Sequence, residues 1–275
     1  MPENPLQKHF RQPKIFISLP SKGVYNNPGT IRGDVTRLPV YGMTGMDEII
    51  IRTPEALLTG ESTVRIIQSC CPNIVDAWSL TALDTELVLT SIKIATYGNK
   101  LEVKHTCPEC KAVNDYELEL GKFIEHYAQF KYNNTVQLDD LTVKIQPLTY
   151  KQATDFNLRN FGLQQRMAQA LELPEGDERN KIVAELFQQL SVLQNEIYAA
   201  SVESVELPDQ VVTEQTFIQE WLRNSEKSVL DQIKMVFEDN TERLKTPNQD
   251  VECDNCHHVS TVSVELDQSN FFVKA

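Results

Sequence analysis

Four cysteines in two evenly spaced pairs are the residues of this sequence best suited to chemistry. Cys107 and Cys110 stand in HTCPEC, and Cys253 and Cys256 stand in VECDNC. A CxxC turn places two sulfur atoms on one side of the chain, and zinc accepts four thiolates at tetrahedral corners about 2.3 Å away. The pattern therefore predicts a zinc ribbon, with one structural Zn²⁺ per chain shared by two distant knuckles.

Other roles for these cysteines stay open at the level of sequence. They could be independent redox motifs, although neither pair has the strand-to-helix context typical of such centres. They could also belong to two metal-free hairpins, or to a site that uses one of the adjacent histidines, His105, His257 or His258. A catalytic zinc needs an open coordination position, and four cysteines leave none. Cys70 and Cys71 fall on an expected helix and are interpreted as buried thiols.

The charge of the chain disfavours nucleic acid as a partner. Its 26 basic and 39 acidic residues give a formal net charge of −13, which repels a phosphate backbone. The strands around the cysteine pairs are themselves acidic, with Glu109, Asp115, Glu117, Glu119, Glu252, Asp254, Glu265 and Asp267. A zinc-ribbon nucleic-acid-binding accessory protein is therefore the least favoured alternative.

The hydropathy of the chain predicts a cytoplasmic protein without membrane insertion. No apolar run approaches the roughly 20 residues that cross a bilayer, and MPENPLQKHFRQPK at the start lacks the apolar segment of a secretory signal. In a reducing cytoplasm, paired cysteines bind metal more readily than they form disulfides. The hydrophobic fraction of 41% in 275 residues is sufficient for a packed core.

Hydrophobic and polar residues alternate on both sides of each cysteine pair. LEVKHT and NDYELEL predict a β-hairpin with CPEC near its tip, and the chain returns to alternation after VECDNC. When Cys107 is aligned with Cys253, residues 116–120 (YELEL) fall on residues 262–266 (VSVEL). The two knuckles are thus interpreted as halves of a weak internal repeat.

Helices are expected before and between the two knuckles. Thr44 with Asp47 resembles a capping box, TPEALLTG over 53–60 predicts a compact helix, and 79–98 predicts the longest early helix. Thr149 with Gln152 marks a similar start in the second half. Further helices are expected over 151–171, over about 177–205, in FIQEWLRN and in SVLDQIKMVFEDN.

Together these elements predict an α+β fold, in which a small β region with two zinc-knuckle hairpins is joined to a helical bundle. We expect an extended N-terminal arm over 1–30, a mixed α/β region with the first knuckle over 31–145, a helical insert over 146–245, and a C-terminal hairpin with the second knuckle over 246–275. The arm is expected to bind a partner, because unpaired strand edges add to a neighbouring sheet. On this interpretation, a chain without residues 1–25 folds but does not assemble.

No constellation of catalytic residues stands out in the sequence. SLPSKG lacks the glycine-rich loop that cradles phosphates, and no Ser-His-Asp arrangement is evident. We therefore expect a protein that is not an enzyme and acts as an interaction scaffold.

The order of several segments resembles a known family. FISLPSKGVY, LPVYGMTGMDE, TPEALLTGESTVRIIQSC, LDTELVLTSIKIATYG, HTCPEC and CDNCHHVSTVSVELDQSNFF follow one another over about 15–272. That order is similar to the baseplate hub protein family of contractile-tailed, T-even-type bacteriophages. The zinc prediction depends on this sequence's own cysteines and not on the family.

The resemblance implies a non-enzymatic structural component in the hub region of a contractile phage tail baseplate. Its partners would be other baseplate, hub and tail proteins, several copies would enter one assembly, and it would belong to the virion after assembly in the host cytoplasm. An alternative that the resemblance leaves open is a chaperone of hub assembly that is absent from the mature particle.

Overall fold

The computed structural model of the chain describes residues 5–51 and 59–262. It contains helices and short antiparallel strands, which is the α+β composition that the sequence predicts. The chain divides into two compact units, of which unit 1 comprises residues 1–130 and 244–275, and unit 2 comprises residues 131–243. The compact helix predicted over 53–60 falls mainly outside the described residues.

Helix α4 (Ala82–Tyr97) is the centre of unit 1. Its residues are apolar around most of the circumference, and Leu83, Leu87, Val88 and Ile92 are all at most 2% exposed. A helix that is hydrophobic on all sides must be covered on all sides. Besides its two longer hairpins, the described part of unit 1 also contains η1 (Gln7–His9), β1 (Ile15–Ile17), β2 (Leu38–Val40), α1 (Gly45–Ile51), α3 (Glu61–Cys70), η2 (Ala77–Ser79) and α5 (Leu120–Gln129).

Two antiparallel hairpins complete unit 1. The first pairs β3 (Lys100–Thr106) with β4 (Val113–Glu119). The second pairs β9 (Gln249–Glu252) with β10 (Val259–Val262), from the C-terminal segment of the chain. Each cysteine pair lies in the loop that joins the two strands of one hairpin.

The segment predicted as an extended arm over 1–30 is part of unit 1 from Arg11 onward. The Arg11 guanidinium donates to the carbonyl oxygens of Gly42 at 2.9 Å and of Ser69 at 2.7 Å. Strand β1 pairs with β2, and Leu19 is 1% exposed. The physical reason is that the apolar residues of this segment fill the core beside α4, which a free arm would leave in water.

The N-terminal segment also supplies donors to a buried carboxylate. Asp84 accepts hydrogen bonds from the Ser21 hydroxyl at 2.5 Å, the Ser21 N–H at 3.0 Å and the Asn26 amide at 2.8 Å. Burial raises the pKa of Asp84, and these donors oppose that shift. Residues 21–26 are therefore held by polar contacts as well as by packing.

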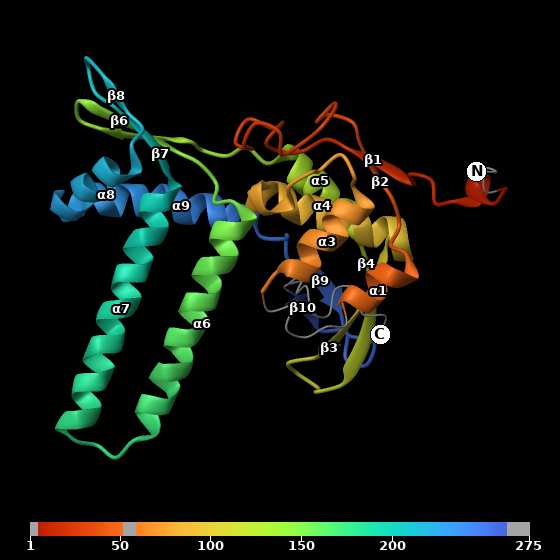
Figure 1. Ribbon diagram of the computed structural model, residues 1–275. Coiled ribbons are helices and arrows are strands. Elements are labelled where there is room, and N and C mark those ends of the chain that lie inside the picture. The colour runs from red at the N-terminus through yellow and green to blue at the C-terminus, as the bar shows by residue number, and fades with distance from the viewer. Residues whose placement is uncertain (1–4, 52–58, 263–275) are drawn as a thin grey trace. The chain divides into compact units, whose positions relative to one another are not determined.

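Unit 2 combines a four-stranded sheet with four helices. The sheet order is β5-β6-β7-β8, all antiparallel, formed by Thr135–Leu138, Leu141–Ile145, Val202–Glu206 and Val211–Val212. Between β6 and β7 the chain makes a long hairpin of two helices that lie side by side, α6 (Tyr150–Glu172) and α7 (Asp177–Ser201) (Figure 1). Helices α8 (Gln215–Asn224) and α9 (Lys227–Leu244) follow the sheet.

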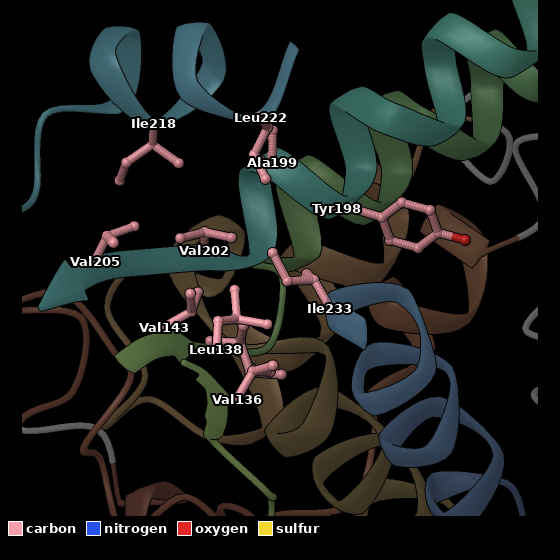
Figure 2. Close-up of a cluster of buried hydrophobic side chains, with 11 residues drawn as sticks. Val136, Leu138, Val143, Tyr198, Ala199, Val202, Val205, Ile218, Leu222 and Ile233 are labelled. Atoms are coloured by element: carbon pink, nitrogen blue, oxygen red, sulfur yellow. The ribbon is translucent and has the colours of Figure 1, made fainter. Parts of the chain in front are cut away.

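The core of unit 2 lies between this sheet and the helices. Figure 2 shows Val143 and Val202 from neighbouring strands facing Ile218 of α8 and Ile233 of α9, and Ile233 is 0% exposed. The sequence predicts helix up to about residue 205, but α7 ends at Ser201 and β7 begins at Val202. The β-branched Val202 and Val205 favour a strand, and both fill this core. The segment expected as a helical insert over 146–245 thus contains two strands, and the boundary at 145/146 falls inside unit 2.

Both predicted helix starts are present. The Thr44 hydroxyl and the Asp47 carboxylate exchange hydrogen bonds with each other's backbone N–H groups, at 3.3 and 2.7 Å. Thr149 and Gln152 form the same reciprocal capping box at the start of α6. Among the described residues, none of the helices combines the length and apolar content required to cross a bilayer.

Candidate metal centre

The two cysteine pairs meet in unit 1. The sulfur atoms of Cys107, Cys110, Cys253 and Cys256 all lie within 4.8 Å of one another. Cys107 Sγ is 3.7 Å from Cys256 Sγ, and Cys110 Sγ is 3.6 Å from Cys253 Sγ. Each of these two contacts joins a cysteine of the first hairpin to a cysteine of the second.

These sulfur separations fit a tetrahedral zinc ion. With Zn–S bonds of about 2.3 Å, the edge of a regular tetrahedron is about 3.8 Å. A disulfide would require about 2.05 Å between the sulfur atoms, and all four cysteines are free thiols in this structure. The four residues therefore have the donor chemistry and the spacing of a structural zinc site.

The backbone of the first knuckle is folded tightly around its cysteines. The Cys107 N–H donates to Ala112 O at 2.9 Å, and the Lys111 N–H donates to Cys107 O at 3.1 Å. Lys111 closes the turn with a φ of 61°, in the left-handed region that non-glycine residues adopt infrequently. This conformation turns the chain back into β4 directly after Cys110.

The second knuckle repeats the first, residue for residue. The Cys253 N–H donates to His258 O at 3.0 Å, the His257 N–H donates to Cys253 O at 2.9 Å, and His257 has a φ of 59°. The local geometry thus agrees with the internal repeat that the sequence suggests. Two similar turns facing each other supply two sulfur atoms each.

Asn114 connects the two knuckles beside the sulfur atoms. It lies on β4 and is 6% exposed. Its amide nitrogen lies 3.4 Å from Cys253 Sγ, and its amide oxygen accepts the Asp254 N–H at 3.2 Å. Groups that hydrogen-bond to metal ligands orient them and tune their basicity. Asn114 therefore has the position of a residue that orients Cys253.

Two further contacts join the hairpins away from the sulfur atoms. The Tyr116 hydroxyl donates to Glu252 O at 3.0 Å, and His105 Nε2 lies 3.1 Å from Ser260 Oγ. These contacts place β4 next to β9 and β3 next to β10. They hold the hairpins in the arrangement that brings the cysteines together.

Hydrogen bonds favour the thiolate form in part of the cluster. The Asn255 side chain, followed by the Ala112 N–H, lowers the pKa of Cys110 to about 6. The backbone N–H groups of Cys256 and Asn255 lower the pKa of Cys253. The His258 N–H lowers the pKa of Cys256, but burial and the adjacent sulfur atoms raise it by more, so that the pKa of this thiol is above its ordinary value. A divalent cation would remove the repulsion among the thiolates, and the thiolate is the form that binds metal.

A comparison with protein families identifies the kind of protein that carries this site. The model of the T4 bacteriophage base plate protein family matches residues 47–273, which is most of the chain. The chain belongs to this family. It is thus a T4-like phage baseplate protein, a tail component of the virion that associates with other tail and baseplate proteins. No curated protein and no solved structure matches the chain.

Two of the three histidines near the knuckles of this baseplate protein, His257 and His105, contact other groups. His257 Nδ1 lies 2.7 Å from a carboxylate oxygen of Glu252, and His105 Nε2 contacts Ser260. Within the described residues, the group that could hold a metal contains cysteines alone.

Cys70 and Cys71 are buried thiols, as the sequence predicts. Both are 0% exposed, and burial raises the pKa of each to about 12. Such thiols stay protonated and unreactive at neutral pH. They lie on or next to α3 and serve as part of the core of unit 1.

Sequence reasoning did not identify Asn114 in this centre. The residue follows the first knuckle by four positions, and an asparagine in NDYELEL carries no signal beyond that of a turn or an exposed strand position. Only the pairing of the two hairpins shows that its amide faces Cys253.

Proposed function

We propose that this chain is a non-enzymatic structural subunit of the hub region of a contractile tail baseplate, stabilised by one Zn²⁺ bound by Cys107, Cys110, Cys253 and Cys256. Membership of the baseplate family supports the location. The observation that carries the structural role is the convergence of four sulfur atoms from the two distant hairpins.

The role of the zinc follows from how unit 1 is composed. Its first segment ends at residue 130, and its second segment begins at residue 244, after the whole of unit 2. The short hairpin β9–β10 contributes few core side chains, with Val251 and Val262 each 8% exposed. An ion shared with β3–β4 would fix this second segment to the first, because structural zinc supplies folding energy directly.

A saturated coordination shell supports a structural and not a catalytic use of the metal. Catalytic zinc sites keep a position for water or substrate, whereas four thiolates occupy all corners of the tetrahedron. In this proposal, the zinc holds surfaces in place and the surfaces bind neighbouring proteins of the baseplate.

The content of mature particles tests the proposed role. Phage would be grown with an epitope-tagged copy of the chain, and purified virions and isolated baseplates would be analysed by quantitative mass spectrometry and immunogold labelling. We expect a fixed number of copies per particle and label at the centre of the baseplate. A chain that is required for assembly but absent from purified particles would instead be an assembly chaperone, and label at the baseplate rim would contradict the hub location.

A further inference from the structure

The four cysteines of the candidate metal centre differ in their access to solvent. Cys107 and Cys253 are each 1% exposed. Cys256 is exposed, and Cys110 is partly exposed. The susceptibility of a cysteine to oxidation depends on its exposure. A small oxidant dissolved in water therefore reaches Cys110 and Cys256 first.

Two short contacts between the hairpins each pair an accessible cysteine with a buried one. The sulfur atom of Cys256 lies 3.7 Å from that of the buried Cys107, and the sulfur atom of Cys110 lies 3.6 Å from that of the buried Cys253. Because a disulfide bond is about 2.05 Å long, the two atoms of each pair would have to approach by only about 1.6 Å. Each accessible sulfur thus has a second thiol from the other hairpin within reach.

Other pairings of the four cysteines fit this arrangement less well. A bond within one CxxC knuckle would have to form inside a turn whose backbone is already fixed, as the hydrogen bond from the Lys111 N–H to Cys107 O fixes the first knuckle. Strain in such a bond makes it easier to reduce. The remaining pairing would leave Cys107 and Cys253, both buried, to react with each other without an accessible sulfur.

Polar contacts keep the two hairpins aligned without help from a metal ion. The Tyr116 hydroxyl donates to Glu252 O at 3.0 Å. The Asn114 side chain contacts the second knuckle directly, since its amide nitrogen lies 3.4 Å from Cys253 Sγ and its amide oxygen accepts the Asp254 N–H at 3.2 Å. These contacts would hold the knuckles next to each other while their sulfur atoms react.

We propose that a peroxide oxidant converts the four cysteines into two disulfide bonds between the hairpins, Cys107–Cys256 and Cys110–Cys253. This inference rests on the zinc site of the proposed function and describes the same cysteines after loss of the metal. The two chain segments of unit 1 then stay joined covalently. The outcome matters for a virion component, because virion surfaces are among the oxidising environments in which disulfides form and persist.

The reaction balances with one molecule of hydrogen peroxide for each disulfide. The accessible thiolate gives two electrons to the peroxide, the O–O bond breaks, and the sulfur becomes a sulfenic acid while hydroxide leaves. The buried thiolate then attacks this sulfur, the S–O bond breaks, and a second hydroxide leaves. For the whole cluster, four thiolates, two peroxide molecules and four protons give two disulfides and four water molecules, and a bound Zn²⁺ is released without a change of oxidation state.

Disulfide mapping of the oxidised full-length protein tests the proposal. Zinc-loaded protein would be treated with two equivalents of hydrogen peroxide, its free thiols would be alkylated, and its peptides would be analysed by mass spectrometry. Trypsin places the two cysteine pairs on separate peptides, since it cleaves after Lys104, Lys111 and Lys245. A protease that cleaves after acidic residues cuts at Glu109 and Asp254, between the cysteines of each pair. Together the two digests assign each disulfide.

We expect the two tryptic peptides to be linked, with the pairings proposed above in most of the product. Zinc release, followed with a chromophoric indicator, should rise in step with the disulfides. Cys70 and Cys71 should remain free thiols, because both are 0% exposed. The proposal is overturned by disulfides mainly within each knuckle, by the other pairing between hairpins, or by sulfinic and sulfonic acids without disulfides.

The same protein unfolded in urea is the matched control. In an unfolded chain, loop closure favours a bond within a CxxC pair over one between residues 143 positions apart by on the order of 100-fold. The main products should therefore change from bonds within the knuckles in urea to bonds between them in the folded chain, and identical products would contradict the proposal. Purified protein without zinc would refute the proposed metal site, whereas the disulfide map of the folded chain would still decide this inference.

Discussion

The sulfur atoms of Cys110 and Cys253 lie 3.6 Å apart, although the two residues are 143 positions apart in the sequence. All of unit 2 lies in the chain between them. The same four-sulfur cluster therefore joins the two chain segments from which unit 1 is built. Zinc bound by finger peptides contributes about 10–16 kcal/mol of apparent free energy at neutral pH, which is comparable to the net stability of about 5–15 kcal/mol of a whole domain.

Zinc content is the most direct test of the shared site. Protein purified without chelator is expected to contain one Zn²⁺ per chain by elemental analysis. The double variant Cys253→Ser with Cys256→Ser should contain none, since two remaining thiolates cannot fill the shell. His257→Ala is the matched control, because His257 adjoins Cys256 but contacts Glu252 instead of the sulfur atoms. Metal retained by the double variant would show that the knuckles do not share an ion.

Removal of the metal is expected to loosen the hairpins before the rest of the protein. Without the ion, β9–β10 keeps only a few hydrogen bonds to the first hairpin, such as that from Tyr116 to Glu252. Amide hydrogen exchange after treatment with chelator should accelerate over residues 249–262 and over the turn of the first knuckle. The α6–α7 hairpin serves as the internal control, because its amides belong to unit 2. Uniform acceleration across both units would contradict this local role.

Asn114 should affect zinc affinity without acting as a ligand. Asn114→Ala removes the amide that contacts Cys253 Sγ and the Asp254 N–H. Loss of such an outer contact typically weakens metal binding by about 10–100-fold. Competition with a chromophoric chelator would measure the change, with the stoichiometry still at one zinc. Glu109→Gln, at an exposed position within the first knuckle, should leave the affinity unchanged.

The paired cysteines were predictable because ligand spacing is encoded locally. A CxxC turn dictates its own geometry, and alternation around each pair indicates the strands, so both knuckles follow from short stretches of sequence. The helix starts at Thr44 and Thr149 were predictable for the same reason, since a capping box depends on residues three apart.

The features of the fold and of the site that the sequence did not predict depend on contacts between distant segments. The packing of residues 11–30 against α4 could not be predicted from the prolines and glycines of that stretch, which are equally typical of an exposed arm. Strand β7 follows α7 without a break, and its valines favour a strand only because β6 lies beside it. The role of Asn114 likewise depends on a hairpin more than 130 residues further along the chain.

Deletion of the N-terminal segment should disrupt unit 1. A chain without residues 1–25 loses β1, Leu19 and the two donors from Ser21 to the buried Asp84. Burial of an apolar side chain of this size contributes about 1.5–3 kcal/mol, and each hydrogen bond to a charged group contributes about 1.5–3 kcal/mol, although Asp84 keeps the donor from Asn26. We expect aggregation or loss of cooperative thermal unfolding. Deletion of residues 1–10 is the control, because residues 5–10 are exposed throughout, and a folded product of the longer deletion would contradict the packing described above.

Glu86 on α4 gives unit 1 a pH dependence with a defined sign. Burial raises the pKa of this carboxyl from 4.5 to about 7. In this pH range the unfolded chain releases the proton of Glu86 more readily than the folded chain does. The free energy of unfolding therefore falls as the pH rises from about 4.5 to 7. Glu86→Gln keeps the shape without the charge.

The stability of the variant relative to the wild type should therefore increase by about 1–3 kcal/mol between pH 5 and pH 8. Urea unfolding of both proteins with saturating zinc at pH 5, 6.5 and 8 measures this difference, and comparison at each pH cancels the zinc contribution. Glu102→Gln, at an exposed position on β3, should show no difference at any pH. If the difference in the free energy of unfolding between Glu86→Gln and the wild type is the same at all three pH values, the Glu86 carboxyl is ionised at each of them. It would then be in contact with water or a cation.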